Sequence, residues 1–556
     1  MSKREVITIS FIILIYTIIS FINLGSTKNP ETFWKSEYSG ENVIIKLSEE
    51  YVQNVKYYNG VEPGEYKLYT SLDGRNYFFF ENIEKGDCFE WNEIACDRYF
   101  QYVKIEAQNS NTYIGEIAFY NGSGEQIKIS AVDESAEAII DEQNIVPKKI
   151  NFMNSTYFDE VYHANFAYRY VNSLEFYDVH PPLGKLIIAA SIALFGMNPF
   201  AYRLMGNIAG ILMILVIYIM AKDMFKDKKY GYLAAIIMAL DNFHFAQTRI
   251  ATLDSFLVLF IMLSFMFMYK YVILDRDEKL KKKLLMLFLS GLFMGLAIAT
   301  KWTGCFAAIG LAIIFFSKFL KNIFIKEASV DKEKIVIEFN KDKKIKEIVI
   351  TVLSCIVFFV AIPVVIYCLC YIPHEGVDSL KDIWDLQVSI YNYHSDLEAE
   401  HPYTSKWYTW FIMQRPVWYY LGSTEVGTRS TIAAIGNPLI WWVGLISMIY
   451  VLLKGIFKFK KECFVIIIAV FTAILPYLFI DRIMFLYHYF PVLPFMMLSI
   501  VMLIKDIESK IKFKYIGVIY GIIILATFIY FYPVVSGMEV SNEYIESTRW
   551  LDSWYY

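Results

Sequence analysis

The sequence predicts a polytopic α-helical membrane protein that carries an extracytoplasmic β-sandwich insert. Of its 556 residues, 56% are hydrophobic and 19% charged, and the mean hydropathy is +0.39, whereas soluble domains have about 45–50% apolar and about 25% charged residues. The apolar residues gather in blocks of about 18–22 residues, long enough to cross a hydrocarbon core of about 30 Å. A separate stretch near the N-terminus alternates apolar and polar residues, as half-buried strands do. This composition excludes an ordinary soluble enzyme, and a formal net charge of -4 with no basic domain argues against a nucleic-acid partner.

About eleven blocks qualify as membrane-spanning helices. They cover residues 6–24, 200–221, 231–246, 251–273, 284–300, 303–320, 347–372, 437–453, 462–480, 484–504 and 514–533. The first block follows Met-Ser-Lys-Arg-Glu, which resembles the start of a signal peptide, but it is longer than a usual signal-peptide core and lacks an evident cleavage site. We therefore expect this helix to be retained, with its N-terminus in the cytoplasm.

Lysine-rich loops set the orientation, because Lys and Arg accumulate in short cytoplasmic loops. Five loops on the predicted inner side are rich in lysine: 222–229, 276–283, 321–346, 454–461 and 505–514. The two long connections and the C-terminal tail then lie outside. We expect a multi-pass protein of the plasma membrane whose active site faces away from the cytoplasm.

The chain accordingly divides into seven segments. They are the first transmembrane helix (1–26), the insert (27–146), an outer catalytic loop (147–199), helices two to seven (200–372), a second outer loop (373–436), helices eight to eleven (437–533) and an outer tail (534–556).

The insert has the features of a small antiparallel β domain. Apolar and polar residues alternate in Asn42-Val-Ile-Ile-Lys-Leu and Tyr102-Val-Lys-Ile-Glu, and turns such as Asp73-Gly74 separate the runs. Ser71-Leu-Asp-Gly-Arg-Asn-Tyr, together with Ile114-Gly-Glu-Ile, resembles the discoidin or galactose-binding-like jelly roll. Carbohydrate binding and a spacer or docking role both remain open, and we expect its removal to spare the membrane core. Whether Cys88 and Cys96 form a disulfide is also open.

Two acidic and histidine-containing motifs precede the second predicted membrane span. Asp159 and Glu160 lie in Phe-Asp-Glu-Val, and His180 begins His-Pro-Pro-Leu-Gly-Lys. Adjacent acids on a loop are usually only solvated charges, but these lie beside the membrane and among aromatic residues, and the prolines stiffen the following turn. This rigidity favours an active site.

Cations inside apolar spans are costly and are functional candidates. Four of them fall at the predicted outer ends of helices: Arg203, Arg249, Lys301 and Arg482. Snorkelling anchors and interhelical ion pairs are the alternative for any single one, but four on one side of the membrane point to an anionic ligand. Cations at headgroup depth suit a lipid-linked phosphate, and carboxylates nearby suit deprotonation of a hydroxyl.

Seven motifs in order resemble the protein O-mannosyltransferase family. They are Phe-Asp-Glu-Val, His-Pro-Pro-Leu-Gly-Lys, Arg203, Gln247-x-Arg-x-x-x-Leu-Asp-Ser, Thr300-Lys-Trp-x-Gly, the string from Tyr393 to Trp407, and Tyr487-His-Tyr-Phe-Pro. The resemblance implies a membrane glycosyltransferase of the C-type fold that moves mannose from a polyprenyl-phosphate carrier to Ser or Thr hydroxyls of exported proteins. The second outer loop is too short for the β-trefoil of eukaryotic members, the insert is not part of the usual pattern, and Tyr487 stands where many relatives have His. These departures indicate a prokaryotic member and leave the sugar, the acceptor and the oligomeric state open.

The resemblance suggests roles for the residues. Because the leaving group would be a polyprenyl phosphate, which can leave as an anion, one base is enough. Asp159 is the candidate base for an inverting displacement, and Glu160 positions the base or the acceptor. The candidate phosphate ligands are Arg203, Arg249, Lys301 and Arg482, and the candidate sugar or acceptor ligands are His180, His401, His488 and Tyr489. No cofactor is required, although a divalent cation on the two acids stays an alternative.

Two other functions compete with this interpretation. A polyprenyl-phosphate-sugar transferase could act on a lipid or glycan instead of a protein. A sensor or transporter could bind sugar through the outer domain. Transporters, however, commonly show internal repeats and ionisable residues near the bilayer midplane, whereas this sequence shows no repeat and its ionisable residues cluster at one surface.

Overall fold

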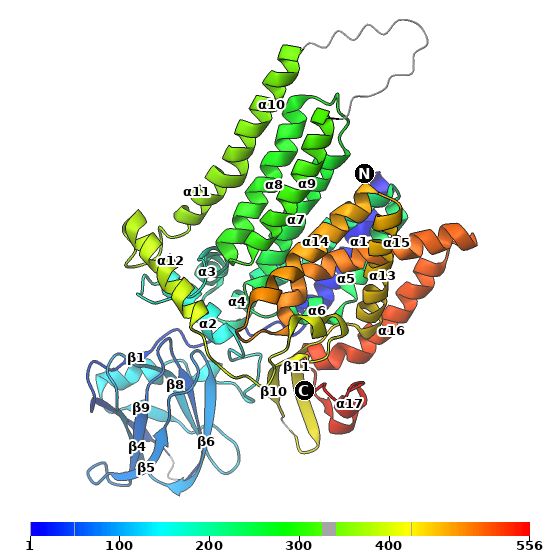
Figure 1. Ribbon diagram of the computed structural model, residues 1–556. Helices are drawn as coiled ribbons and strands as arrows, with labels where there is room; N and C mark the ends of the chain where they lie inside the picture. The colour runs from blue at the N-terminus through cyan, green and yellow to red at the C-terminus, as the bar shows by residue number, and fades with distance from the viewer. Residues whose placement is uncertain (1, 49–50, 325–340, 424) are drawn as a thin grey trace, which may run out of the picture. The chain divides into compact units, whose positions relative to one another are not determined.

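The computed structural model describes residues 2–48, 51–324, 341–423 and 425–556 (Figure 1). The chain forms two compact units. The sandwich unit comprises residues 23–174 and 187–205, and the helical unit comprises residues 1–22, 175–186 and 206–556.

The sandwich unit contains two antiparallel sheets. The first has the order β5 (Phe78–Ile83), β4 (Tyr66–Ser71), β7 (Tyr102–Ala107), β2 (Asn42–Leu47) and β9 (Ile129–Ala131). The second has the order β1 (Trp34–Lys35), β8 (Tyr113–Tyr120), β3 (Tyr51–Asn59) and β6 (Trp91–Tyr99). Short 3₁₀ helices η1 (Glu134–Ile139) and η2 (Gln143–Ile145) follow the strands.

One hydrophobic core joins the two sheets. Alternate residues of β2, such as Val43 and Ile45, are buried together with Val55 of β3 and Ile105 of β7. Because side chains alternate between the faces of a strand, this period of two fills the space between the sheets. The predicted β-sandwich is thus confirmed, and Cys88 and Cys96 within it are free thiols.

The sandwich unit also contains helical segments. Helix α2 (Glu160–Val171) lies wholly within it, whereas α3 (Leu183–Phe195) begins in the helical unit and α4 (Pro199–Phe225) continues into it. The outer catalytic loop predicted over 147–199 therefore contributes residues to both units.

The helical unit consists mainly of long apolar helices (Figure 1). The helices that lie wholly in this unit, long and short, are α1 (Lys3–Phe21), α5 (Lys228–Ala239), α6 (Asn242–Thr248), α7 (Asp254–Ile273), α8 (Leu280–Thr300), α9 (Gly304–Phe324), α10 (Lys341–Ile356), α11 (Ile362–Leu369), α12 (Leu380–Ser395), α13 (Pro438–Phe457), α14 (Lys461–Ile474), α15 (Leu493–Ile511), α16 (Ile516–Ser536) and α17 (Asn542–Ser547). A π-helical turn, Val357–Ala361, joins α10 to α11. A small sheet contains β10 (Val417–Gly422), β11 (Thr428–Ala434) and β12 (Val540–Ser541).

Ten helices in the described residues are long and apolar enough to cross a membrane. The third predicted span, 231–246, differs from the prediction because α5 ends at Ala239 and α6 starts at Asn242. The Asp241 carboxylate accepts a hydrogen bond from the backbone N–H of His244 at 2.9 Å, so it caps α6 and stabilises the break. Two short helices thus replace one predicted span.

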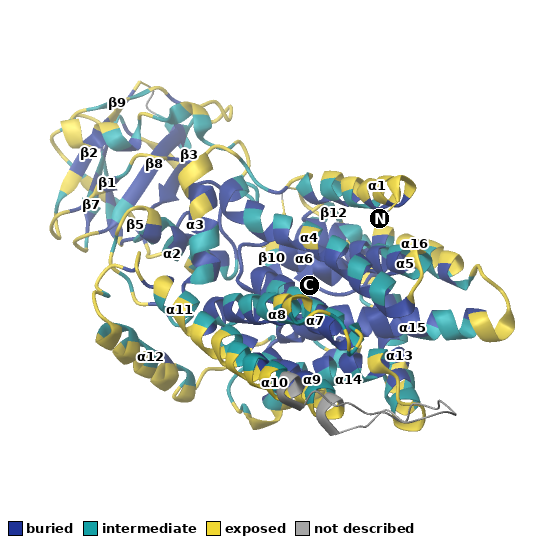
Figure 2. Cartoon of the chain, turned by 90° about the horizontal axis from the view of Figure 1, so that it is seen from above, coloured by how far each residue is buried: buried dark blue, intermediate teal, exposed yellow. Residues whose placement is uncertain are grey.

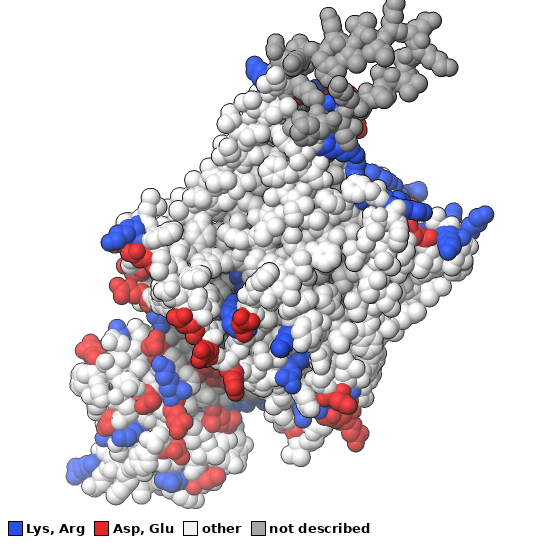
Figure 3. All heavy atoms as spheres, in the orientation of Figure 1, with Lys and Arg blue, Asp and Glu red and all other residues white. Residues whose placement is uncertain are grey.

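Ion pairs connect the N-terminal part of α1 with the ends of several other helices at one end of the helical unit. Lys222 pairs with Glu5, Lys229 with Glu508 at 2.6 Å, Lys270 with Asp223 at 2.5 Å, and Lys454 with Asp506. Figure 3 shows Lys and Arg side chains gathered around the C-terminal end of α15. The positive-charge pattern predicts this arrangement, although part of the predicted loop 321–346 lies outside the described residues.

Burial differs strongly among the helices (Figure 2). Within the apolar window of the span Leu486–Ile511, 78% of residues are buried, compared with 11% for Ile345–Leu369. An apolar helix that exposes Val360 and Val364 is stable where lipid is the solvent. The α10–α11 face is therefore a lipid-facing surface.

Candidate active site

Asp159 and Glu160 begin helix α2 in the sandwich unit. Asp159 is partly exposed at the N-cap position, whereas Glu160 is completely buried. The preceding residue, Phe158, has φ +52°, in the left-handed region that non-glycine residues seldom adopt. Such strain is often found at functional sites. The local backbone thus separates two neighbouring acids into different environments.

Arg203, in the first turns of α4, binds Glu160 with both ends of its guanidinium fork. Its Nε donates to Glu160 Oε1 and its Nη2 to Oε2, both at 2.7 Å. The remaining donors bind backbone carbonyls of Leu24, Phe152 and Ser155 at 2.7–3.0 Å. All five N–H groups of a guanidinium are thus engaged within the protein. These contacts favour a structural role for Arg203 over the predicted phosphate contact.

A second buried ion pair shapes the His-Pro-Pro turn in the helical unit. The Lys185 ammonium pairs with Asp178 and donates a hydrogen bond to the carbonyl of His180 at 2.9 Å. The Asp178 carboxylate also accepts the backbone N–H of His180 at 3.0 Å. Burial lowers the pKa of Lys185, and the charge of Asp178 opposes that shift. Asp178 thus binds the backbone N–H of His180 and Lys185 binds its carbonyl, so the ion pair fixes the position of His180.

His394, at the C-terminal end of α12, lies against this turn. Its ring stacks on His180 with centroids 5.4 Å apart, and its Nε2 lies 2.9 Å from the carbonyl oxygen of Val179. Its Nδ1 is buried and has no hydrogen-bond partner among the residues that the structure describes. Burial and then the charges of Arg482 and Lys301 lower the pKa of His394. Sequence reasoning quoted this histidine in a motif but did not assign it a role; its place in that motif was the available signal.

Lys301 ends helix α8 and pairs with Asp254. Their Nζ and Oδ1 atoms are 2.9 Å apart, and both side chains are about one-tenth exposed. The ammonium also lies 5.6 Å from the ring centroid of Tyr487. Asp254, which belongs to the same sequence motif as Arg249, thus neutralises Lys301.

Arg249 binds the end of α1. Its Nε and Nη2 donate to the carbonyls of Ser20 and Ile22 at 3.1 and 2.6 Å, and its guanidinium lies 4.6 Å from the ring centroid of Phe245. A cation suits this position because the last carbonyls of a helix lack intrahelical donors and carry partial negative charge. These contacts favour a structural role over the predicted phosphate contact.

Arg482 is half-buried and lines a cavity of about 760 Å³ together with Lys406 and Arg415. In the part of the chain that the structure describes, its guanidinium makes no hydrogen bond or ion pair with protein. Asp481 is the acidic residue in the same lining. The cavity is therefore a net-positive pocket that can accept an anionic ligand.

The remaining predicted sugar ligands differ in access. His401 is half-buried; its Nδ1 accepts the backbone N–H of Tyr403 at 3.2 Å, and its ring contacts Phe485 at a centroid distance of 5.0 Å. His488 is buried, and its ring stacks on Trp410 at 5.8 Å. Of His401 and His488, His401 is the more accessible, so it remains the better candidate for a ligand contact.

Tyr489 is completely buried, contrary to its prediction as a sugar ligand. Its ring packs on Trp441 at 5.0 Å, and its hydroxyl faces the sulfur atoms of Met448 and Met496 at 4.0 and 3.5 Å. The 3₁₀ turn η6 (Leu486–Val492) directs this side chain into the core. These contacts favour a packing role for Tyr489 over the predicted sugar contact.

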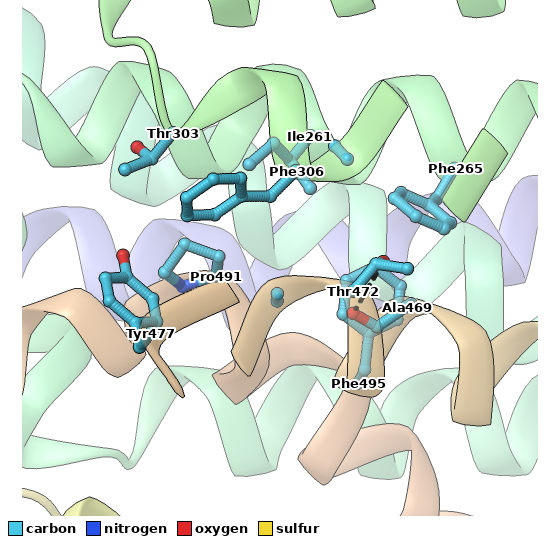
Figure 4. Close-up of a pocket in the computed structure, with 11 residues that line it drawn as sticks. Ile261, Phe265, Thr303, Phe306, Ala469, Thr472, Tyr477, Pro491 and Phe495 are labelled. Carbon is cyan, nitrogen blue, oxygen red and sulfur yellow. Dashed lines mark hydrogen bonds between the residues drawn. The ribbon is translucent and has the colours of Figure 1, made fainter. Parts of the chain in front are cut away.

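A smaller cavity lies among mostly apolar side chains of α7, α9, α14, α15, η6 and the 3₁₀ turn Leu475–Phe479 (Figure 4). Phe265, Phe306 and Phe495 line it, and its volume is about 10 Å³. This is about the space that one water molecule needs. It is too small for a sugar and represents imperfect packing between helices.

An acidic group with the spacing of metal ligands occurs within the described part of the sandwich. It consists of Glu116, Asp141 and Glu142. Chain donors already occupy these carboxylates: the backbone N–H of Glu142 binds Glu116 at 2.9 Å, and the Thr32 hydroxyl binds Asp141 at 2.9 Å. The arrangement is explained by hydrogen bonding within the domain.

Two sequence-family comparisons match most of the chain after the insert. The family described as dolichyl-phosphate-mannose-protein mannosyltransferase matches residues 145–199 and 195–377. The family described as the C-terminal four-transmembrane region of protein O-mannosyltransferase matches residues 379–554. The first match starts at residue 145, so nearly all of the β-sandwich precedes it.

Individual proteins resemble the chain over a similar extent. A polyprenol-phosphate-mannose–protein mannosyltransferase of Mycolicibacterium smegmatis is 24% identical over 68% of this chain and 82% of its own length. The enzyme of the same description from Mycobacterium tuberculosis is 23% identical over 71% and 86%. A chain of the Saccharomyces cerevisiae protein O-mannosyltransferase Pmt1-Pmt2 complex bound to the sugar donor has a TM-score of 0.62 at 13% identity, covering 72% of this chain and 89% of that one. The last comparison establishes a shared fold.

Proposed function

The chain belongs to the dolichyl-phosphate-mannose-protein mannosyltransferase family, and on this premise we propose that Asp159 is the base of its transfer reaction. The protein is a multi-pass membrane mannosyltransferase, which passes mannose from a lipid-linked donor to protein. The acceptors are Ser or Thr hydroxyls of exported proteins. The active site faces the extracytoplasmic side of the plasma membrane.

The observation that carries the assignment of the base is the engagement of Glu160 by Arg203. A carboxylate held by two hydrogen bonds from a buried guanidinium is a poor proton acceptor, because protonation would leave the cation unpaired. Asp159 is the neighbouring carboxylate that is partly exposed. Glu160 therefore orients the start of α2, and Asp159 takes the proton.

The proposed reaction is a single displacement with inversion at the sugar C1. The acceptor oxygen attacks C1, its proton moves to Asp159, and the bond between C1 and the phosphate oxygen breaks. A phosphate monoester has a second pKa of about 6, so it can leave as an anion without a general acid. The products are the mannosylated hydroxyl and the polyprenyl phosphate.

Arg482 and Lys301 are the proposed ligands of the donor phosphate. Arg482 lines the net-positive cavity. Lys301 pairs with Asp254 through its ammonium, and the ammonium's other N–H groups can donate to a phosphate oxygen. His180 and His394 are the proposed hydrogen-bonding partners of the donor beside these cations. Their rings stack on each other, and the hydrogen bond from Lys185 to the His180 carbonyl fixes the position of His180. Within the sandwich unit Arg203 holds the backbone near Asp159, and within the helical unit Arg249 holds the end of α1.

A transfer assay with the purified full-length protein tests this proposal. Labelled polyprenyl-phosphate mannose is supplied with a peptide containing Ser and Thr, or with the same peptide in which Ala replaces both. We expect label in the first peptide alone, with the opposite anomeric configuration from the donor. Label that enters only lipid or glycan products, or a product with retained configuration, would overturn the acceptor or the mechanism respectively.

A further inference from the structure

We propose that the β-sandwich positions the catalytic carboxylate: one surface of the sandwich holds the chain on both sides of Asp159. We call this surface the docking face; it consists of Val61, Glu62, Cys88, Phe89 and Trp91. The proposal rests on the role of Asp159 as the base. It assigns to the insert a function within the reaction, where a tether or a separate binding module would need no contact with this segment.

The docking face binds the chain just before Asp159. The backbone N–H of Thr156 donates to the carbonyl of Phe89 at 3.2 Å, and its hydroxyl donates to the carbonyl of Cys88 at 2.7 Å. The backbone N–H of Trp91 donates to the Ser155 hydroxyl at 3.0 Å. Ser155 and Thr156 are both buried. These hydrogen bonds therefore form away from water, where breaking them is costly.

The same face binds helix α2 just after Asp159. The Cys88 thiol donates to the carbonyl of Val161 at 2.9 Å in the first turn of the helix. Further along, Asn165 Nδ2 donates to the carbonyl of Val61 at 2.9 Å, and Arg169 Nη2 lies 2.5 Å from a carboxylate oxygen of Glu62. The contacts thus continue over nearly the whole length of α2.

Aromatic packing adds to this docking. The rings of Phe89 and Tyr168 meet edge to face with centroids 5.1 Å apart. Phe89 is buried and has φ +57°, so the loop that carries it adopts a strained conformation at the point of contact. The docking face is therefore a shaped surface and not a chance contact between flexible loops.

The strain at Phe158 explains why the site needs such support. This residue has φ +52° and immediately precedes Asp159. A non-glycine residue stays in this region only when its surroundings determine the backbone strongly. The contacts at Thr156 and Val161 bracket the strained residue, and the Arg203–Glu160 pair fixes a third point. The sandwich thus supplies two of the three anchors, which opposes the expectation that removal of the insert spares the membrane core.

Two helix-side variants of the full-length protein test the proposal. Arg169→Met removes the ion pair with Glu62, and Asn165→Ala removes the hydrogen bond to Val61. We expect kcat to fall about 10–100-fold in the double variant, because small displacements of a catalytic group have effects of this size. The donor KM should change less than twofold, since no donor ligand is altered. Arg169→Lys keeps the charge and should recover most of kcat.

Glu106→Gln is the matched control. Glu106 lies on β7 of the same domain and pairs with Lys104 at 3.5 Å, away from the docking face. This variant should have normal kcat and a normal melting temperature. The proposal is overturned if the double variant retains kcat within twofold. It is also overturned if donor KM, kcat and the melting temperature all deteriorate together, because that result describes a general loss of folding.

Asp159→Asn, assayed in parallel, separates this inference from the proposed function. If Asp159→Asn is inactive and the double variant is active, the sandwich does not position the base although the base assignment stands. If Asp159→Asn keeps its activity, the base assignment fails, and the positioning proposal fails with it.

Discussion

Glu160 and Arg203 form a bidentate ion pair in which both N–O distances are 2.7 Å and both side chains are almost fully buried. The two residues are 43 positions apart in the sequence. Their pairing gives two adjacent acids different roles, because Glu160 is committed to the guanidinium and Asp159 is not part of that pair. It also explains why α4 carries the buried Arg203 without requiring a bound ligand.

Replacing Arg203 should therefore damage stability before donor binding. Arg203→Lys keeps one charge but cannot bind Glu160 through a fork and also satisfy the carbonyls of Leu24, Phe152 and Ser155. Breaking a buried ion pair costs about 3–5 kcal/mol. Thermal unfolding in detergent should show a large decrease in melting temperature. Normal stability with a raised donor KM would instead return Arg203 to the phosphate site.

Asp159→Asn should abolish transfer while folding and donor binding stay normal. The amide has nearly the shape of the carboxylate but cannot accept a proton, and a general base contributes about 10²–10⁴-fold. Asp385→Asn, at an exposed carboxylate of α12, is the control that should leave the rate unchanged. Rates of mannose transfer to a peptide decide the matter. More than about a tenth of normal activity in Asp159→Asn would exclude it as the base.

Arg482 and Arg249 should respond differently to the same substitution. Arg482→Gln should lower kcat/KM for the donor about 10–100-fold at unchanged melting temperature, since a charge-assisted hydrogen bond contributes about 1.5–3 kcal/mol. Arg249→Gln should lower the melting temperature, because the carbonyls of Ser20 and Ile22 lose their donor. Donor titrations and thermal unfolding distinguish the two. An exchange of these two phenotypes would reverse their assignments.

The Lys301–Asp254 pair can be separated into structural and functional parts by a double substitution. Lys301→Met alone leaves Asp254 nearly buried without its cation, so stability and donor use should both fall. Adding Asp254→Leu should restore the melting temperature, because no unpaired charge then remains. Donor kcat/KM should stay low if Lys301 binds phosphate. Recovery of donor use in the double variant would show that the pair is purely structural.

The sandwich should become less stable between about pH 4.5 and pH 7. Burial raises the pKa of Glu116 from 4.5 to about 7, so in this range the folded domain binds more protons than the unfolded chain. The contribution of Glu116 to the free energy of unfolding is then fully present below pH 4.5 and is lost as the pH rises through 7. Hydrogen exchange of the β8 amides, corrected for intrinsic rates, measures this opening. Glu116→Gln should flatten the pH dependence, and an unchanged slope would contradict the assignment.

Local patterns in the sequence predicted the membrane architecture and the existence of the sandwich. A span such as 251–273 is recognisable because its transfer into lipid depends on the sum of its own side chains, and α7 (Asp254–Ile273) matches it closely. The alternation in β2 is equally local, because a strand places successive side chains on opposite faces. The break between α5 and α6 was missed, since the cap at Asp241 interrupts an apolar run without a proline or glycine.

Only the tertiary structure decided what each charged residue contacts. Arg203, Arg249 and Lys301 all lie near helix ends and are indistinguishable by hydropathy, yet the first binds a carboxylate 43 residues away and the second binds carbonyls about 229 and 227 residues away. The same holds for Tyr489 and His394. Tyr489, a predicted sugar ligand, has its ring packed in the core, whereas His394, which had no predicted role, lies on His180. Hydropathy reports the free energy of a side chain in a solvent, whereas a role depends on partners that folding brings together from distant segments.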